Sequence, residues 1–426
     1  GTTLANGGLN DAFIVKYDTN GFVQWVTNVS STAVDIGYGI DTDSSGNVYV
    51  AVGTNTVAEI TVRNSDTTIA TLTVAGLGII KYNTDGVVQW FQTIQGTTNT
   101  ISNNRAITVD PIGNSYITGA SPSGEAVRVY GGGNSLFKIL ISTTSVGAFV
   151  IKQDSSGNVQ WLAQINGTGN SVVSDTLGNI YVTGQGISGA ISTAFNSDGS
   201  AFGTTIANSG NNDGFIVKYN TNGFVQWVAR IGSAGIDTAN GITLDSSGNV
   251  YVTGVYSATA TAFNANGTAF GTTLTHAGGN DVFVVKYNTN GAVQWFTRMS
   301  SNNIDSGIGI KTDTSANVYV TGGFRNTLTV FNANGTAFGR TLGSAGAGDM
   351  FLVKYDTNGT VQWVAKAGSA WGGGEESGAD LAVDSLGNSY IVGFQGTNPF
   401  SAFNSDGTQF PVSIPSRASG DAYILK

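Results

Sequence analysis

Three features of the 426-residue sequence predict an all-β fold of the β-propeller class. A tryptophan-centred string occurs six times, with its tryptophans 65, 71, 66, 68 and 68 residues apart. Apolar residues within each string alternate with a period of two, which is typical of strands. No apolar stripe of helical period runs past about two turns. A repeat of this kind over the whole chain indicates one repeat architecture and a single domain spanning 1–426.

The tryptophan string predicts a hairpin. In FIVKYNTNGFVQWV, Phe215, Val217 and Tyr219 share one face of the first strand, and VQWV forms the second strand. The NTNG or DTNG tetrad between them supplies a tight turn whose glycine adopts positive φ. The six tryptophans are Trp25, Trp90, Trp161, Trp227, Trp295 and Trp363.

A second string, GITLDSSGNVYVTG at 241–254, also occurs six times and predicts another hairpin around DSSGN. Its tyrosines are Tyr49, Tyr116, Tyr181, Tyr251, Tyr319 and Tyr390. Each period therefore contains four short strands. Four strands repeated radially form the blades of a β-propeller, so we expect six four-stranded blades.

Each repeat also carries an insertion, because an ordinary blade needs only about 40–45 residues. Four insertions contain an Asx-Gly turn flanked by phenylalanines, at 195–203, 263–271, 331–339 and 403–411, and two are divergent, at 60–72 and 127–139. We expect an extra hairpin in each repeat. Because all six leave the blade at the same point, we expect a crown of hairpins on one face. The candidate contact residues there are Phe195, Phe263, Phe331 and Phe403.

The two strings together, D-A-F-[IV]-V-K-Y-[DN]-x-x-G-x-V-Q-W and G-I-x-x-D-S-S-G-N-x-Y-V-T-G, resemble the SBBP β-propeller repeat. The resemblance covers nearly the whole chain. It implies a propeller in secreted or surface-exposed proteins, and similar repeats occur in proteins of large DNA viruses. It implies no catalytic residues.

By analogy with the related NHL repeats, GITLD is expected to be the innermost strand and VQWV the outermost. Strands at 11–26 would then close the ring with strands at 379–393. A closed ring of six four-stranded blades leaves one strand surplus. This strand, Asp421–Lys426, duplicates Asp11–Lys16. Three interpretations stay open: the strand is displaced, the chain is cut from a longer propeller, or the strand pairs with another molecule.

Composition excludes several classes of function. The net charge is −9 and no basic run occurs, which argues against nucleic acid or an anionic membrane surface as partner. No apolar stretch approaches the roughly 20 residues of a membrane span. Cysteine is absent and histidine occurs once, so we expect no disulfide, no metal site and no cofactor. The chain opens on Gly1 without a signal peptide, and we expect a mature or partial product.

The recurring polar residues are better explained by structure than by chemistry. Asp43 and its counterparts precede a tight turn, which favours an Asx-type turn over a calcium loop. We expect the lysine in the middle of each FIVKY strand to pack its stem on the neighbouring blade with its ammonium at solvent. Glutamate occurs four times and never in a repeated position, so paired carboxylates for glycoside hydrolysis are not expected.

One loop departs from the repeat. WGGGEESG carries the non-repeated Trp371 beside Glu375 and Glu376, and is a candidate glycan contact or an ordinary surface loop. Asp421 and Lys426 bound the surplus strand and are candidate assembly residues.

These observations favour a non-enzymatic structural protein, extracellular or on a virion or cell surface, that assembles through its hairpins and edge strands. The expected partners are further copies of the chain or other surface proteins. The alternative is a glycan- or protein-binding module. An enzyme has the least support, although propellers host many functions.

Overall fold

The computed structural model describes residues 4, 7–54, 58–64, 68–74, 76–96, 104–121, 126–130, 136–141, 147–189, 192–344, 347–369, 376–396, 398–415 and 421–426. All regular elements in these ranges are β-strands, and they form a β-propeller, as predicted. The chain divides into two compact units. Unit one is Gly1–Val182, Ser192–Thr205 and Val217–Gln226. Unit two is Thr183–Ile191, Ile206–Ile216 and Trp227–Lys426.

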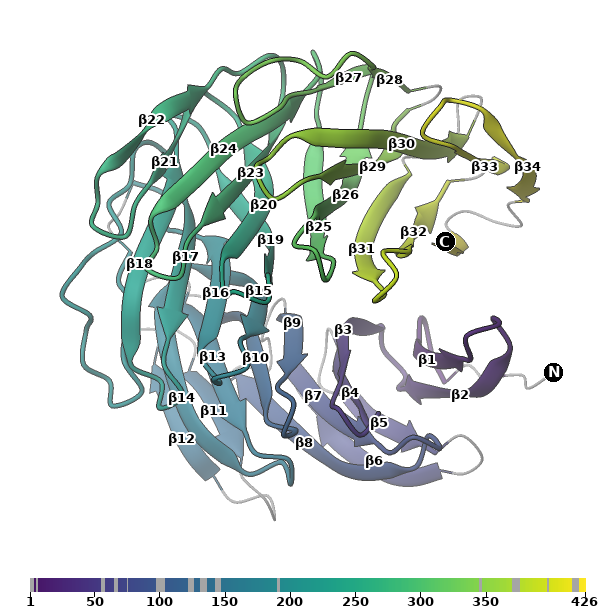
Figure 1. The fold of residues 1–426 in the computed structure, drawn as a ribbon. Coiled ribbons are helices and arrows are strands. Elements are labelled where there is room, and N and C mark those ends of the chain that lie inside the picture. The colour runs from purple at the N-terminus through teal and green to yellow at the C-terminus, as the bar shows by residue number, and fades with distance from the viewer. Residues whose placement is uncertain are drawn as a thin grey trace. The chain divides into compact units, whose positions relative to one another are not determined.

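Unit one contains three whole sheets (Figure 1). The first has the order β1 (Ala12–Tyr17), β2 (Val23–Ser30), β5 (Ala58–Arg63) and β6 (Thr68–Val74). The second has the order β3 (Asp35–Thr42), β4 (Val48–Thr54), β7 (Gly76–Tyr82), β8 (Val88–Gly96), β11 (Ala126–Tyr130) and β12 (Leu136–Ile141). The third has the order β9 (Asn104–Val109), β10 (Ser115–Ser121), β13 (Gly147–Gln153) and β14 (Val159–Asn166).

The division between the units falls within the fourth sheet. Its order is β15 (Thr168–Ser174), β16 (Ile180–Gln185), β17 (Gly214–Tyr219), β18 (Val225–Gly232), β21 (Ala260–Phe263) and β22 (Ala269–Leu274).

Unit two contains the remaining three sheets. One has the order β19 (Thr238–Leu244), β20 (Val250–Tyr256), β23 (Asp281–Tyr287), β24 (Val293–Ser300), β27 (Thr327–Val330) and β28 (Leu342–Gly343). The next has the order β25 (Ser306–Thr312), β26 (Val318–Phe324), β29 (Asp349–Tyr355), β30 (Val361–Ser369), β33 (Phe400–Phe403) and β34 (Gln409–Ile414). The last has the order β31 (Ser377–Val383), β32 (Ser389–Gln395) and β35 (Asp421–Leu425).

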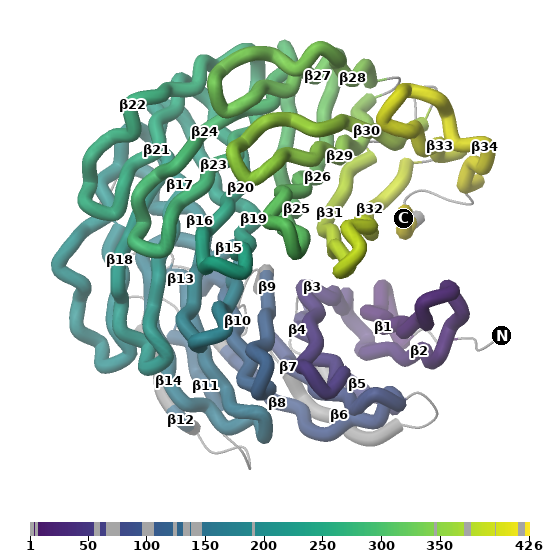
Figure 2. Tube along the Cα trace, in the orientation of Figure 1, coloured from purple at the N-terminus to yellow at the C-terminus, as the bar shows by residue number. Residues whose placement is uncertain are grey.

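The inserted hairpins do not form the predicted crown. Each one pairs with the fourth strand of the preceding repeat and extends that sheet: β5 joins β2, β11 joins β8, β21 joins β18, β27 joins β24, and β33 joins β30. The segment around Phe195 reaches β14 in the same way, through the bridge between Ile165 and Ala194. Figure 2 shows this crossing within unit two, where β27 and β28 lie outside β24. The C-terminal ends of the fourth strands, such as Arg230–Gly232 of β18, explain the difference, because pairing their amides and carbonyls is more favourable than leaving them on an outer edge.

The number of sheets also differs from the expectation. Seven sheets of three to six strands are present among the described residues, where six four-stranded blades were predicted. The extra sheet arises because β35 pairs with β32, while β1 and β2 begin a sheet of their own. The closure predicted between 11–26 and 379–393 stays a prediction.

The core of each unit lies between successive sheets. In unit two, Tyr251, Val284 and Trp295 pack with Phe351 and Tyr355 of the following sheet. The strands that begin each sheet contact one another in succession, β3 with β9 and β15 in unit one, and β19 with β25 and β31 in unit two. Large aromatic side chains therefore supply the burial that joins one repeat to the next.

Candidate interaction surface

A repeated hydrogen bond connects five of the six repeated tryptophans to the turn of the next repeat. The indole Nε1 donates a hydrogen bond to the carbonyl of the turn residue after the Asx position. The recorded pairs, with distances of 2.9–3.2 Å, are Trp25 with Thr84, Trp90 with Ser155, Trp161 with Thr221, Trp227 with Thr289, and Trp295 with Thr357. The same indole lies against the ring of the tyrosine that ends the next third strand, as in Trp295–Tyr355 at 6.3 Å. Sequence reasoning identified these aromatic residues as core but not this hydrogen bond.

The strand register explains where the repeated lysines lie. Lys286 is opposite Tyr251 on one side and opposite Trp295 on the other, so the three side chains form a row on one face of the sheet. The Lys286 ammonium lies 5.0 Å from the Tyr251 ring centroid and donates to the Thr357 carbonyl of the next repeat. The final lysine, Lys426, lies 5.0 Å from the Tyr390 ring in the same way. A cation over an aromatic face is attracted by its quadrupole.

The repeated turn aspartates form Asx turns, as the sequence favoured. Asp384 Oδ1 accepts hydrogen bonds from the backbone N–H groups of Leu386 and Asn388, at 3.0 and 2.8 Å. The Asn388 amide and the Tyr390 hydroxyl donate to Oδ2. The hydrogen bond from Asn388 holds the pKa of Asp384 below its usual value. Among the residues that the structure describes, no group of three or more acidic or histidine side chains could hold a metal ion.

A second set of acids was missed by sequence reasoning. Asp237 and Asp305 are buried before the first strand of their sheets, where each accepts hydrogen bonds from the backbone and hydroxyl of the serine four residues earlier. Burial raises the pKa of Asp237 to about 6 and that of Asp305 to about 7. The recurring spacing Ser-x-x-x-Asp, seen in SAGID and SNNID, could have revealed them.

Glu376 occupies the corresponding place in the last repeat. It is buried, and its Oε1 accepts from the Ser369 hydroxyl at 2.8 Å. Burial raises its pKa. Trp371 and Glu375, the other two residues of the predicted loop site, lie outside the described residues.

The hairpin phenylalanines pack against cations of the sheet that they extend. The Arg230 guanidinium lies 3.5 Å from the Phe263 ring centroid, Arg298 lies 4.2 Å from Phe331, and the Lys366 ammonium lies 4.8 Å from Phe403. The Phe195 backbone instead donates to the Gln164 carbonyl at 2.8 Å. The structure thus brings Phe403 and Lys426 to one groove and leaves Phe195, Phe263 and Phe331 at separate hairpins.

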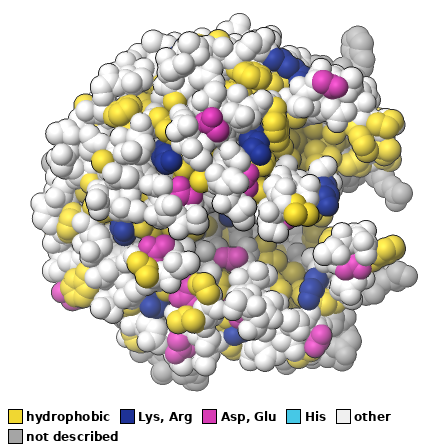
Figure 3. Space-filling view, viewed as in Figure 1, with side chains coloured by type: hydrophobic (Ala, Val, Ile, Leu, Met, Phe, Trp, Pro, Cys, Tyr) yellow, Lys and Arg dark blue, Asp and Glu magenta, His cyan; other side chains and the backbone are white. Residues whose placement is uncertain are grey.

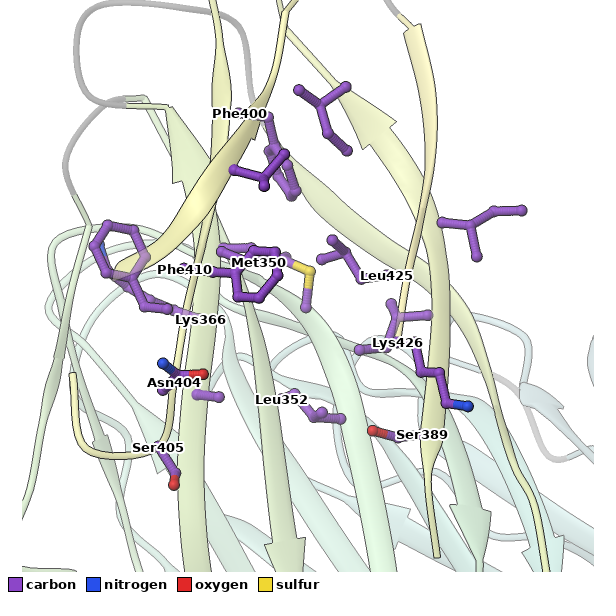
Figure 4. Close-up of a pocket in the computed structure, with 18 of the residues that line it drawn as sticks. Met350, Leu352, Lys366, Ser389, Phe400, Asn404, Ser405, Phe410, Leu425 and Lys426 are labelled. Carbon is purple, nitrogen blue, oxygen red and sulfur yellow. The ribbon is translucent and has the colours of Figure 1, made fainter. Parts of the chain in front are cut away.

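The groove is apolar, has a volume of about 480 Å³ and lies within unit two, between the outer strands of one sheet and β35 (Figure 4). Its lining includes Met350, Leu352 and Trp363, and Lys366 and Lys426 are among the few charged residues there. Hydrophobic side chains also gather on the surface over β33 and β34 (Figure 3). Phe410 and Val412 of β34 and Ile424 of β35 are exposed, each at 50% or more. Protein interfaces are typically built around exposed apolar patches of this kind.

A second cleft of about 390 Å³ lies on the outside of unit two. It is lined by Phe270, Thr272, Lys286, Gln294 and Trp295, together with Ala333 and the turn residues Thr357 and Asn358. An aromatic ring beside amide, hydroxyl and ammonium groups can contact a sugar.

Comparisons with known proteins agree with the repeat. Residues 226–255 match the SBBP β-propeller repeat, which confirms the resemblance given by the sequence. The chain is 27% identical over 489 aligned positions to the uncharacterized WD repeat-containing protein L264 of Acanthamoeba polyphaga mimivirus. The alignment covers 99% of this chain and 34% of that protein, so the chain spans about a third of the relative.

Solved structures give distant matches. Virginiamycin B lyase from Staphylococcus aureus is 9% identical with a TM-score of 0.37, over 96% of this chain and 90% of the lyase. Rhamnogalacturonan lyase YesW is 12% identical with a TM-score of 0.28, over 89% of this chain and 75% of that enzyme. In the described part of the chain, no helix has the length and apolar character needed to cross a membrane.

Proposed function

We propose that this chain is a non-enzymatic protein-interaction propeller that assembles through the outer surfaces of its terminal sheets. The observation that carries the proposal is the apolar groove of unit two, together with Phe410, Val412 and Ile424 beside it. An extended apolar surface with few charges suits a protein partner, because association removes that area from water. An extracellular, virion-surface or cell-surface setting belongs to the same proposal.

The equivalent surface in earlier repeats supports this proposal. Ile424 occupies the position of Val284 in the third strand, and Val284 is completely buried while Ile424 is 54% exposed. Side chains that the repeat elsewhere buries between sheets are available at the groove. The mimivirus relative supports an interaction role, because it is described as a WD repeat-containing protein.

The test is the mass of the purified chain in solution. We expect sedimentation velocity to show reversible growth beyond the 43.7 kDa monomer between about 1 and 100 µM, the range in which moderate interfaces associate. Phe410→Asp should abolish that growth, because a carboxylate would be buried without a partner. Leu177→Asp alters a strongly exposed leucine on a unit-one turn and should change nothing. A single 43.7 kDa species throughout this range would refute assembly.

The alternative is glycan binding, favoured by the cleft of about 390 Å³ around Phe270. Calorimetric titration with neutral oligosaccharides tests it, with Phe270→Ala expected to abolish binding and Leu177→Ala to preserve it. Absence of heat with a broad oligosaccharide panel would exclude this alternative.

A further inference from the structure

Among the described residues, the hydrogen bonds between tryptophans and turns of successive repeats leave one indole N–H and one turn carbonyl unused at the two ends of the repeat series. Five tryptophans reach a turn carbonyl of the following repeat, but no acceptor is recorded for Trp363 Nε1 in the described part of the chain. Trp363 instead forms part of the apolar groove. The leftover turn is the first one, where Thr19 stands at the position of Thr357. The two ends of the repeat series thus carry the two halves of one such hydrogen bond.

In the part of the chain that the structure describes, no side chain packs on Gly21 of the first turn, whereas the equivalent turns of the later repeats contact an indole. A Cβ atom on Gly86, Gly157, Gly223, Gly291 or Gly359 would lie within 3.0 Å of the indole of the preceding repeat. A Cβ atom on Gly21 would meet nothing within 4 Å. The turn before β2 therefore has the shape of the others and lacks only the indole.

The strand beside this turn is exposed on the corresponding face. Phe13 is 62% exposed and Tyr17 is 46% exposed, whereas Phe283 and Tyr287 at the same positions of β23 are completely buried. On the opposite face of β1, Ala12 and Ile14 are buried. The first sheet thus presents the face that a preceding sheet covers in the interior repeats.

The strands present in the first sheet are those that the last sheet lacks. The complete sheets have six strands in the order one to four followed by the hairpin of the next repeat. The first sheet, β1-β2-β5-β6, has strands three and four with that hairpin, and the last sheet supplies strands one and two as β31 and β32. The position of strand three in the last sheet is occupied by β35, whose DAYILK sequence closely resembles DAFIVK of β1.

We infer that β35 is an exchangeable strand, and that β1 of a second copy of this chain replaces it beside β32. This inference rests on the proposed function and names its partner. The incoming sheet completes the last sheet as β31-β32-β1-β2-β5-β6 and places Tyr17 and the Thr19 carbonyl at Trp363. A second copy is the occupant because β35 of the same chain already holds this edge and closely resembles β1 in sequence.

The exchange gains more contacts than it loses. β35 contributes pairing at five positions and the buried Tyr423, whose ring lies 4.4 Å from Phe400. β1 offers the same pairing with Phe13 in place of Tyr423, and adds Tyr17, the turn and β2. Each copy offers its first sheet to one neighbour and the edge of its last sheet beside β32 to another. The association is therefore head to tail and produces rings or filaments.

The register of the exchanged pair is fixed by its equivalents. Val392 pairs with Ile424 in the structure, as Thr253 pairs with Val284, so Val392 should pair with Ile14 of the second copy. Opposed residues in antiparallel strands have Cα atoms about 4.5–5.5 Å apart, which a disulfide can span. The chain has no cysteine of its own, so any disulfide must form between the introduced cysteines.

The experiment mixes two single-cysteine proteins, Ile14→Cys and Val392→Cys, under mild oxidation. We expect a covalent heterodimer, which should not form when Leu177→Cys replaces Val392→Cys. The double variant Val392→Cys/Ile424→Cys locks β35 in place within one chain, and should lower the association seen by sedimentation to that of a monomer. Deleting 421–426 should strengthen association by about tenfold or more, because it removes the competing strand.

The outcomes separate the two proposals. Growth in mass without the 14–392 cross-link, or growth that survives the β35 lock, would overturn strand exchange and leave the proposed assembly standing. A double variant Ile14→Cys/Val392→Cys that links only within one chain would also overturn exchange between copies. A chain that stays monomeric with or without residues 421–426 would overturn both.

Discussion

Burial raises the pKa of single carboxyl groups and thereby couples folding to protonation. Asp305 is completely buried, and its carboxyl accepts hydrogen bonds from the Ser301 backbone at 2.6 Å and the Ser301 hydroxyl at 2.9 Å. Burial nevertheless raises its pKa to about 7, and Asp281 nearby acts in the same direction. The protonated form is thus favoured in the folded chain. Because the unfolded chain has the ordinary pKa, the folded state binds more protons between about pH 4 and 7.

Replacing Asp305 tests this linkage. The folded-state pKa lies above the unfolded one, so stability from this group is present at low pH and is lost as pH rises toward 7. We compare the free energy of unfolding of Asp305→Asn with that of the unsubstituted protein at each pH. We expect the difference to favour the variant more at pH 8 than at pH 5, by on the order of 1–2 kcal/mol. Urea unfolding of both proteins at the two pH values measures the difference. An equal effect of the substitution at both pH values would contradict the assignment.

Two glycines at equivalent positions separate backbone strain from crowding. Gly359 and Gly21 have φ of 77° and 82°, but only Gly359 is crowded, with its Cβ position 2.7 Å from the Ala333 Cβ and 3.0 Å from the Trp295 indole. In dilute monomer, Gly21→Ala should cost about 1 kcal/mol of stability through the backbone alone. Gly359→Ala should cost about 1–3 kcal/mol more through overpacking. Thermal unfolding measures both, and equal losses would show that crowding by Ala333 and Trp295 contributes nothing.

At the level of elements, the inserted hairpins join neighbouring repeats. The hairpin of β21 and β22 lies between β20 and β23 in the sequence, yet its strand β21 pairs with β18 of the preceding repeat. Through β21, Arg230, Ile231 and Gly232 are covered at the outer edge of β18. A hairpin of this kind ties two successive sheets by backbone hydrogen bonds as well as by side-chain packing.

Excising residues 260–274 and joining the ends with a short Gly-Ser linker should uncover this edge. We expect faster hydrogen exchange at the amides of β18 that face β21, because they would open to solvent. The amides of β30 serve as the internal control, since their partner β33 is untouched. Unchanged exchange at Arg230–Gly232 would mean that the hairpin does not protect β18 in solution.

The sequence predicted the elements better than their partners. Period-two alternation and Asx-Gly turns identified the two hairpins of each repeat, and the Asp384 turn forms as expected. The pairing of β21 with β18 was not predictable, because a hairpin pattern is local and its partner lies some thirty residues away in sequence. The exposure of Phe13 could not be predicted either, since the sequence around it is almost identical to the equivalent strands that are buried in the interior repeats.

For the whole molecule, an apolar contact between copies has to overcome like charge. The chain carries a net charge of −9, so two copies repel each other in dilute buffer. The surfaces in the proposed exchange are apolar, with Phe13 and Tyr17 on one side and the groove over Met350 and Trp363 on the other. Salt screens the repulsion and leaves the burial of apolar area intact.

Association should therefore strengthen with ionic strength. Between about 20 and 300 mM NaCl the screening length falls from roughly 20 Å to under 10 Å, which removes most of the repulsion between exposed charges. We expect the sedimentation-derived dissociation constant to fall by about threefold to tenfold over this range. Phe13→Asp should abolish association at every salt concentration, because it places a carboxylate within the apolar contact. Weakening by salt would instead identify an interface held by ion pairs, such as one formed by the hairpin cations Arg230 and Arg298 with acidic turns of another copy.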